Sequence, residues 1–213
     1  RRIDYVTKEL GESSKQRLKF IYHDLKAPLH EDLIKEIIDV SYIIHIGASS
    51  HVTRSVENPY VFIQDNIMGS FNLLEAARKL NNLELFYYFS TDEVFGPSLS
   101  DEKFKEWDRY NSKNPYSATK AAAEELTISY SNTYSLPVLI SHCSNVYGER
   151  QHYEKYIPNT INKILSNEEI TIHTDLKKIP GSRYYLYNDD LAKTILFLVQ
   201  NYKKIEEESF ANS

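Results

Sequence analysis

The stretch that decides the fold is LFYYFSTDEVFG, residues 85–96. Its first six residues are almost wholly apolar, which is typical of a strand buried on both faces of a parallel sheet. A polar run follows where that strand ends. Working outward, three further stretches read as strands: Val40–Ile46 (VSYIIHI), Leu18–Tyr22 (LKFIY) and Leu136–Ser141 (LPVLIS).

Helical patterns alternate with these strands. Apolar residues between Ile63 and Ala77 recur three or four positions apart, which predicts a long helix over Val61–Leu80. A second helix is expected to begin near Pro115, since proline is tolerated in a first turn, and to end near Tyr134. This alternation predicts an α/β fold with a doubly wound parallel sheet, helices covering both faces. Shorter elements are predicted at Leu33–Ile38, Ile157–Leu165 and Leu191–Tyr202 (helices) and at Ile170–His173 (a strand).

Composition limits the classes of partner. The chain has 213 residues, 41% of them hydrophobic, and a net charge of -5. A nucleic-acid partner is not expected, because neutralising phosphates requires a concentrated basic face. The single cysteine, Cys143, and the lack of a membrane-length apolar run or a signal-peptide pattern predict a soluble, cytoplasmic protein with no membrane partner. The histidines show no metal-ligand spacing, so no metal site is expected.

The first candidate for chemistry is the pair Tyr116 and Lys120. A spacing of i, i+4 puts both side chains on one helix face, where an ammonium can lower the pKa of a phenol and make it a usable base. The spacing alone is weak. Tyr22 and Lys26 share it, and a chain with 17 tyrosines contains about one such pair by chance.

The second candidate is the run Thr91, Asp92, Glu93. In doubly wound sheets, ligands bind outside the carboxyl ends of the strands, where this run falls. A third polar block, Cys143–Gln151 (CSNVYGERQ), follows the next predicted strand, with Glu154–Pro158 (EKYIP) shortly after. Each block taken singly could be a solvated loop. Their combination with the Tyr116 helix predicts an active site.

These motifs together resemble one known family. STDEVFG, NPYSATKAAAE, SNVYGERQ and EKYIP are similar to motifs of the dTDP-glucose 4,6-dehydratases, and occur in the same order. The run His45–Lys79 also resembles that family, within the NAD-dependent epimerase/dehydratase superfamily of extended short-chain dehydrogenases/reductases. The resemblance covers nearly the whole chain from Leu18 to Tyr202 and implies a Rossmann-like fold, NAD as cofactor and a nucleotide-diphosphate sugar as substrate.

The resemblance implies a role for each reactive residue. Thr91 would hydrogen-bond the 4-hydroxyl of the sugar, and Tyr116 would take its proton while hydride leaves C4. Lys120 would lower the Tyr116 pKa and hold the nicotinamide ribose. Glu93 would then remove the C5 proton, and Asp92 would protonate the departing C6 hydroxyl. The hydride returns to C6, which gives a 4-keto-6-deoxy sugar still attached to its nucleotide.

Binding residues follow from the same resemblance. Asp24 and Leu25 match positions near the adenine, and Gly47 and Ala48 match small residues that let the cofactor approach. The long helix and the Tyr116 helix would form a homodimer interface. Substrate-binding positions are matched by Ser50, Asn145, Lys155, Tyr156 and Arg183.

The sequence also departs from the family. It contains no GxxGxxG or GxGxxG, so the first strand–helix unit with its pyrophosphate turn is expected to be absent from this chain. We therefore predict an N-terminally incomplete NAD-binding domain over 1–148, then part of a substrate lobe and returning elements over 149–213. Three single positions also differ, namely Ser49, Asp65 and His142.

Two other functions stay open. One is epimerisation or decarboxylation of a nucleotide sugar on the same fold; the other is a catalytically silent NAD-binding relative. The pair Asp92–Glu93 favours 4,6-dehydration, because elimination needs a base at C5 and an acid at C6. Related epimerases usually lack acids at these positions, and a silent protein has no need to keep five reactive side chains together.

Overall fold

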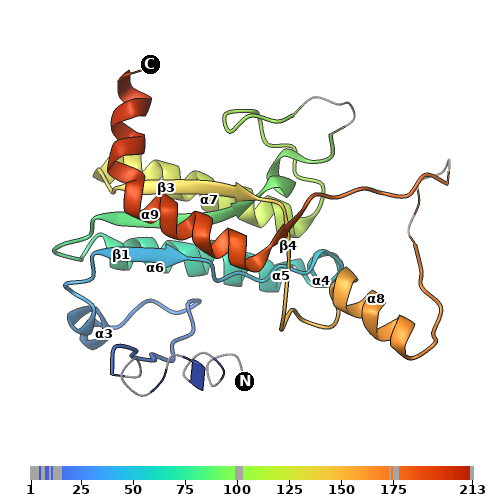
Figure 1. Cartoon of the computed structure of the whole chain (residues 1–213). Helices are drawn as coiled ribbons and strands as arrows, with labels where there is room; N and C mark the ends of the chain where they lie inside the picture. Colours follow the sequence, from blue (N-terminus) through green and yellow to red (C-terminus); the bar gives the residue numbers. More distant parts are fainter. Residues whose placement is uncertain are drawn as a thin grey trace. The chain divides into compact units, whose positions relative to one another are not determined.

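The computed structural model describes residues 5, 8–9, 11, 16–98, 103–172, 174 and 178–211, with the side chains of 206–211 left aside. The chain divides into two compact units. Figure 1 shows its helices and strands, coloured along the sequence. The larger comprises residues 24–144 and 192–213, and the smaller comprises residues 1–23 and 145–191. The proposed division into 1–148 and 149–213 stays a prediction.

A three-stranded parallel sheet forms the centre of the larger unit. Its order is β1 (Tyr42–His45), β2 (Leu85–Thr91) and β3 (Val138–Cys143), so β2 is the middle strand. Phe86 pairs with Ile43 on one side and Val138 on the other. Three of the predicted strands are therefore confirmed. Because all three run parallel, their carboxyl ends, and the polar residues that follow, lie at one edge of the sheet.

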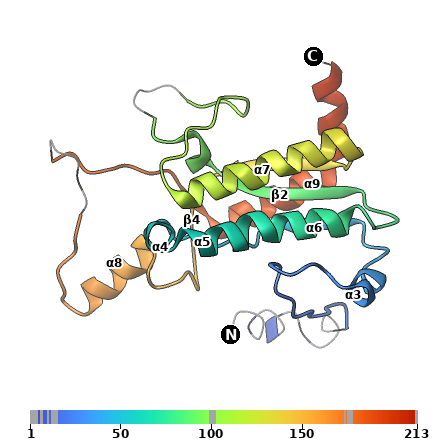
Figure 2. The same cartoon turned by 180° about the vertical axis from the view of Figure 1, so that it is seen from behind.

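Helices cover both faces of this sheet. One face carries α5 (Pro59–Phe62), the π-helical turn η1 (Ile63–Met68), α6 (Gly69–Ala77) and α7 (Pro115–Tyr134), which lie in front in Figure 2. The opposite face carries α9 (Asn188–Ala211), in front of the strands in Figure 1 and behind them in Figure 2. This is the doubly wound α/β arrangement that the alternating pattern predicted, and it agrees with the Rossmann-like fold that the family resemblance implies.

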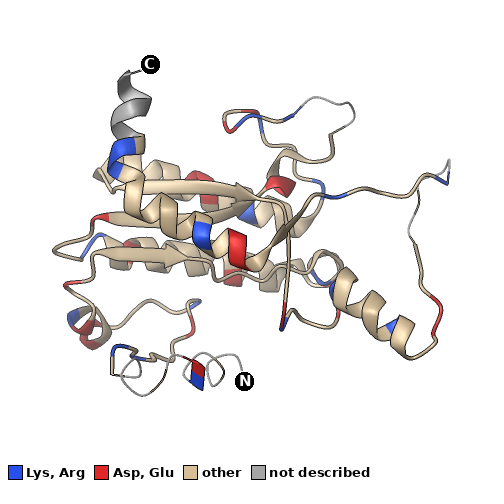
Figure 3. Cartoon of the chain, in the orientation of Figure 1, with Lys and Arg blue, Asp and Glu red and all other residues tan. Residues whose placement is uncertain are grey.

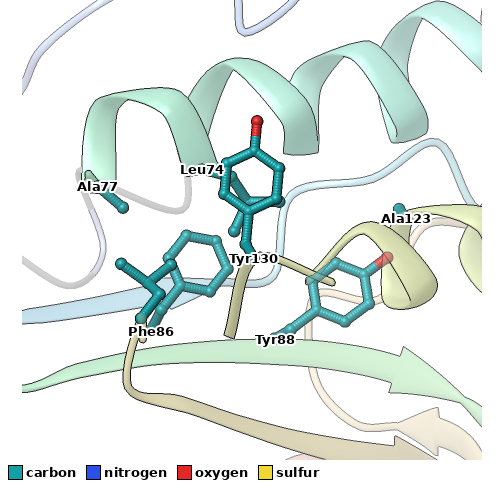
Figure 4. Close-up of a cluster of buried hydrophobic side chains, with 7 residues drawn as sticks. Leu74, Ala77, Phe86, Tyr88, Ala123 and Tyr130 are labelled. Carbon is teal, nitrogen blue, oxygen red and sulfur yellow. The ribbon is translucent and has the colours of Figure 1, made fainter. Parts of the chain in front are cut away.

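The core lies between the sheet and the α6–α7 face (Figure 4). Successive residues of a strand point to opposite faces, so Phe86 and Tyr88 both face the helices, where they are 0% exposed. Leu74 of α6, also 0% exposed, packs into the same cluster with Ala123 and Tyr130 of α7. Full burial of each large apolar side chain stabilises the fold by about 1.5–3 kcal/mol.

The long helix predicted over Val61–Leu80 is confirmed as a helical run but is not uniform. It starts as α5 after Asn58, passes through the π turn η1, and ends as α6 at Ala77. A π turn contains an extra residue and turns neighbouring side chains by one position, and such turns are frequent at functional sites. An additional helix, α4 (Val52–Glu57), precedes it and was not predicted.

Two predicted strands are wrong. Leu18–Tyr22 is irregular, with Tyr22 91% exposed, because among the described residues no strand pairs with it and no core covers it. Residues 170–172 are likewise irregular, and His173 lies outside the described residues. Of the shorter predicted helices, α3 (Glu31–Glu36), α8 (Tyr156–Leu165) and α9 are confirmed.

The smaller unit contains a two-stranded parallel ladder that sequence patterns did not reveal. Asn145 of β4 (Asn145–Tyr147) pairs with Tyr185 of β5 (Tyr185–Tyr187). The rings of Tyr147 and Tyr187 meet at a centroid distance of 5.6 Å across the ladder. Helix α8 follows β4 in the chain.

Charges of both signs are interspersed along the chain (Figure 3), while β1, β2 and β3 carry no Lys, Arg, Asp or Glu. The uncharged strands fit a sheet covered on both faces. In the part of the chain that the structure describes, none of the helices is long and apolar enough to cross a membrane.

Candidate active site

The carboxyl end of β2 places three reactive residues in a row. Thr91 is the last residue of β2 and is buried, and the 3₁₀ helix η2 (Asp92–Phe95) begins directly after it. The Thr91 hydroxyl accepts a hydrogen bond from the Glu93 backbone N–H at 3.3 Å and donates to Oδ1 of Asp92 at 3.3 Å. This local capping forces the chain to turn, so Asp92 and Glu93 sit half-buried at the strand end.

Helix α7 brings Tyr116 to the same place. Asn114 caps the helix in a reciprocal capping box with Ser117, and Pro115 fills the first turn, so Tyr116 is held one residue inside a rigid start. Burial raises the pKa of Tyr116 to about 12; the hydrogen bond with Thr91 lowers it, and the charges of Glu93 and Asp92 raise it. Thr91, Asp92, Glu93 and Tyr116 therefore interact in one site.

Lys120 lies one turn further along α7 and is only 4% exposed. Its ammonium donates to the Phe89 carbonyl at 2.7 Å and lies 4.2 Å from the centre of the Tyr88 ring. Burial lowers its pKa to about 8, against the opposing effect of the Glu124 charge. The role expected for Lys120 in lowering the Tyr116 pKa stays a prediction.

The residues expected near the cofactor converge beside this pair. Gly47 and Ala48 follow β1, and a Cβ on Gly47 would lie 3.8 Å from Cδ1 of Leu25. The Leu25 carbonyl accepts a hydrogen bond from Asn72 of α6 at 2.8 Å, which ties the Asp24–Leu25 turn to the helix layer. Three segments distant in sequence, residues 24–25, residues 47–48 and helix α6, thus lie close together beyond the end of β1.

Asn66 links this loop to α7, and sequence reasoning did not single it out. It is 1% exposed in η1, exchanges two hydrogen bonds with the backbone of Ser49 (2.8 and 3.0 Å) and donates to Thr119 at 2.9 Å. Ser49 also donates to Asp65 at 2.5 Å, so two of the positions that depart from the family pattern contact each other. The sequence signal that could have identified Asn66 is its polar side chain at a helix position that faces the core.

A second unpredicted feature is the buried carboxylate Glu124, which is 1% exposed. It accepts hydrogen bonds from Ser90, Tyr110 and, at 2.7 Å, from Nε2 of His142. Burial works to raise the pKa of Glu124, but these three donors together hold it below its ordinary value. Because Ser90 precedes Thr91 and Glu124 follows Lys120 by one turn, the cluster joins the strand end to the helix.

The expected substrate-binding residues divide between the two units. Ser50 belongs to the larger unit, in the exposed loop after β1. Four belong to the smaller unit: Asn145 begins β4, Lys155 is the residue directly before α8, Tyr156 begins that helix, and exposed Arg183 precedes β5. Nε2 of Gln151 donates to the Val146 carbonyl at 2.7 Å, which fixes the end of the block that begins at Cys143. Their roles in binding stay predictions.

In this chain, the middle strand of a parallel sheet ends at Thr91 and is followed directly by Asp92 and Glu93, beside a helix that carries Tyr116 and Lys120. This arrangement defines a class of protein. It is the class of the epimerase/dehydratase superfamily. Residues 1–211 match the family described as GDP-mannose 4,6 dehydratase. The chain belongs to this family, and its similarity is to the dTDP-glucose 4,6-dehydratase members.

Two curated relatives illustrate the similarity. The chain is 40% identical over 167 residues to the dTDP-D-glucose 4,6-dehydratase of Dictyostelium discoideum, covering 74% of this chain and 37% of that protein. It is 36% identical over 200 residues to a trifunctional UDP-glucose 4,6-dehydratase/UDP-4-keto-6-deoxy-D-glucose 3,5-epimerase/UDP-4-keto-L-rhamnose-reductase of Arabidopsis thaliana, covering 90% of this chain and 29% of that protein. The chain therefore spans less than half of each.

Solved structures agree with this assignment. DesIV, a dTDP-glucose 4,6-dehydratase from Streptomyces venezuelae with NAD and TYD bound, aligns with a TM-score of 0.77 and 31% identity over 86% of this chain and 55% of that one. A UDP-N-acetylglucosamine 4-epimerase from Methanobrevibacter ruminantium aligns with a TM-score of 0.74 and 29% identity over 87% of this chain and 59% of that one. Dehydratases and epimerases thus share this fold.

Proposed function

We propose that the protein is an NAD-dependent nucleotide-sugar 4,6-dehydratase, a hydro-lyase acting on a dTDP- or UDP-glucose type substrate. The observation that carries this proposal is the convergence of Thr91, Asp92, Glu93 and Tyr116 in one site at the end of β2. Elimination of water across C5 and C6 needs two carboxyl groups in different protonation states. Epimerisation needs no such pair, which is why the Asp92–Glu93 pair favours dehydration.

The residues at the sheet edge fit NAD. Lys120 donates to the Phe89 carbonyl, and an ammonium has further N–H donors that suit the hydroxyls of a ribose. Gly47 offers a backbone without a side chain at the end of β1, and the turn at Asp24 and Leu25 lies against it. When bound, oxidised NAD would accept a hydride reversibly and bring a positive charge to the site.

The chain's own residues would perform the proton transfers. Tyr116 would remove the proton of the 4-hydroxyl, which Thr91 orients. Oxidation at C4 makes the neighbouring C5 proton acidic, so Glu93 can remove it as a carboxylate base. Asp92, acting as a protonated acid, would give its proton to the C6 hydroxyl as that group leaves as water.

The electrostatics of the site support this division of roles. Glu93 and Asp92 both raise the pKa of Tyr116 when they are charged. If Asp92 carries a proton, one of these two negative charges is removed and the phenol becomes easier to ionise. A protonated Asp92 therefore suits both the acid role and the base role of Tyr116.

We also infer that the protein forms a homodimer in the cytosol. Several apolar side chains are exposed between Val56 and Met68, a stretch that includes the end of α4 and all of α5 and η1. Exposed apolar surface of this kind favours association. Sedimentation equilibrium of wild type and of a Tyr60→Lys, Val61→Lys variant would test it: a dimer that becomes a monomer supports the interface, and an unchanged mass contradicts it.

Product analysis tests the proposed activity. The purified protein at its full natural length, given NAD and either dTDP-glucose or UDP-glucose, is expected to form an NDP-4-keto-6-deoxyhexose, identified by mass loss of one water. A product of unchanged mass and inverted C4 configuration would instead establish an epimerase. NAD binding without any product would favour the catalytically silent alternative.

A further inference from the structure

Asn114 makes two different contacts at the start of α7. Its side-chain oxygen accepts a hydrogen bond from the Ser117 backbone N–H at 2.9 Å, which caps the helix. Its amide nitrogen donates to Oε2 of Glu93 at 3.2 Å. One side chain therefore starts the helix that carries Tyr116 and also contacts the carboxylate on the neighbouring segment.

The backbone around Glu93 is fixed by other contacts. The Val94 carbonyl accepts a hydrogen bond from the Asn111 N–H at 2.8 Å. Gly96 has a φ of +77°, and a Cβ there would lie 2.5 Å from the Asn111 carbonyl oxygen. Segment η2 is thus closely apposed to residues 111–114, which leaves the rotamer of Glu93 as the main freedom that the Asn114 amide can restrict.

Helix capping alone does not explain the second contact. The chain contains a second Asn-Pro-Tyr helix start, Asn58-Pro59-Tyr60, in which Asn58 is exposed and its side chain makes no capping hydrogen bond. Asn114 differs in being half-buried and in contacting a carboxylate that acts electrostatically on Tyr116.

We propose that Asn114 is a positioning residue whose amide holds the Glu93 carboxylate in the orientation from which it removes the C5 proton. This role rests on the proposed dehydration. To act as a base, the Glu93 carboxylate must be ionised. A hydrogen bond from the N–H of the Asn114 amide favours this charged form. The side-chain amide of Asn114 provides two separate atoms for these contacts, an oxygen that caps the helix and a nitrogen that donates to the carboxylate.

Two substitutions separate capping from positioning. Serine caps helices about as well as asparagine, so Asn114→Ser is expected to keep the wild-type melting temperature. Asn114→Ser replaces the amide nitrogen with a hydroxyl one bond closer to the backbone. The variant should slow exchange of the C5 hydrogen for deuterium by roughly tenfold or more with KM unchanged, since misplacement by about 1 Å costs on the order of 100-fold. Asn114→Asp puts a second carboxylate beside Glu93 and should move the acid limb of the pH profile of this exchange to higher pH.

A spectroscopic readout makes the test independent of turnover. In the purified full-length protein, the ¹³C carboxyl resonance of Glu93 is assigned by its loss in Glu93→Gln. We expect this resonance to move in Asn114→Ser and to stay in the matched control Asn58→Ser. The proposal is overturned if Asn114→Ser exchanges the C5 hydrogen at the wild-type rate and its Glu93 resonance does not move. It is also overturned if a fall in the melting temperature of Asn114→Ser accounts for the whole loss of activity. If wild type makes no dehydrated product but the resonance moves, the dehydration fails while the contact to the carboxylate stands.

Discussion

Protonation of His45 should destabilise the fold in mildly acidic solution. His45 ends β1, is 4% exposed, and its Nε2 lies 2.9 Å from Oγ of Ser70. The Ser70 hydroxyl proton is already donated to the Asn66 carbonyl, so Nε2 of a neutral His45 must donate to Ser70. Burial, together with the charge of Lys120, lowers the His45 pKa to about 4.

Because the pKa of His45 is lower in the folded state than in the unfolded state, the unfolded chain binds the proton first as pH falls. The folded state therefore keeps its full stability above the unfolded pKa and loses stability as pH falls towards the folded pKa. With values of 6.5 unfolded and about 4 folded, linkage predicts a loss of about 2 kcal/mol between pH 7 and pH 5, and about 3 kcal/mol by pH 4. The first interval lies above the ordinary titration range of carboxyl groups. The chain has seven histidines, so the contribution of His45 is obtained as the difference between wild type and a variant that lacks this histidine.

Urea unfolding followed by circular dichroism at pH 7 and pH 5 measures this loss. His45→Gln keeps an N–H donor toward Ser70 but does not titrate, so its free energy of unfolding should fall by about 2 kcal/mol less than that of wild type. His152→Gln, at a half-exposed position, is the matched control and should behave as wild type. Equal losses in wild type and His45→Gln would refute the reasoning.

Three further predictions concern the core and the site. Leu74→Ala should lower the free energy of unfolding by about 2–5 kcal/mol in urea, whereas Leu196→Ala at a 56% exposed position should cost far less; similar costs would contradict the placement of the core. Glu124→Gln should lower the pKa of Lys120 below about 8, because the Glu124 charge is the group that raises it; ¹⁵N NMR of the lysine amine measures this, and an unchanged or raised pKa would count against the cluster. Gly96→Ala should destabilise the protein by at least about 1 kcal/mol in the same urea assay, since φ is +77° and the Asn111 carbonyl occupies the space; a neutral result would show that η2 is not held as described.

Hydrophobic pattern was sufficient for the central architecture. The strand Leu85–Ser90 and the helix Pro115–Tyr134 were predicted within one residue of their observed ends, because a continuous apolar run and a Pro-initiated helix are strong local signals. The same pattern placed Thr91, Asp92 and Glu93 at the end of a buried parallel strand, as observed, while their catalytic roles stay predictions.

Other features depend on contacts that local pattern does not encode. Strands β4 and β5 are three residues each and exist through pairing between segments 40 residues apart. Leu18–Tyr22 has the composition of a strand but no pairing partner among the described strands, so a strand predicted from composition alone was wrong. Nothing in the local sequence distinguishes Asn66 and Glu124 from other polar residues. Their contacts form only in the folded chain, where Ser49 lies against Asn66. Ser90 and His142 lie against Glu124 in the same way.

The most direct test of the central claim follows the hydrogen at C5 of the sugar. The full-length protein is incubated with NAD and dTDP-glucose or UDP-glucose in D₂O, and the product is examined by NMR, with Glu93→Gln alongside. We predict a 4-keto-6-deoxy product carrying deuterium at C5 with wild type, and none with Glu93→Gln. A product that keeps its original hydrogen at C5, or incorporation of deuterium that does not depend on Glu93, would contradict the account.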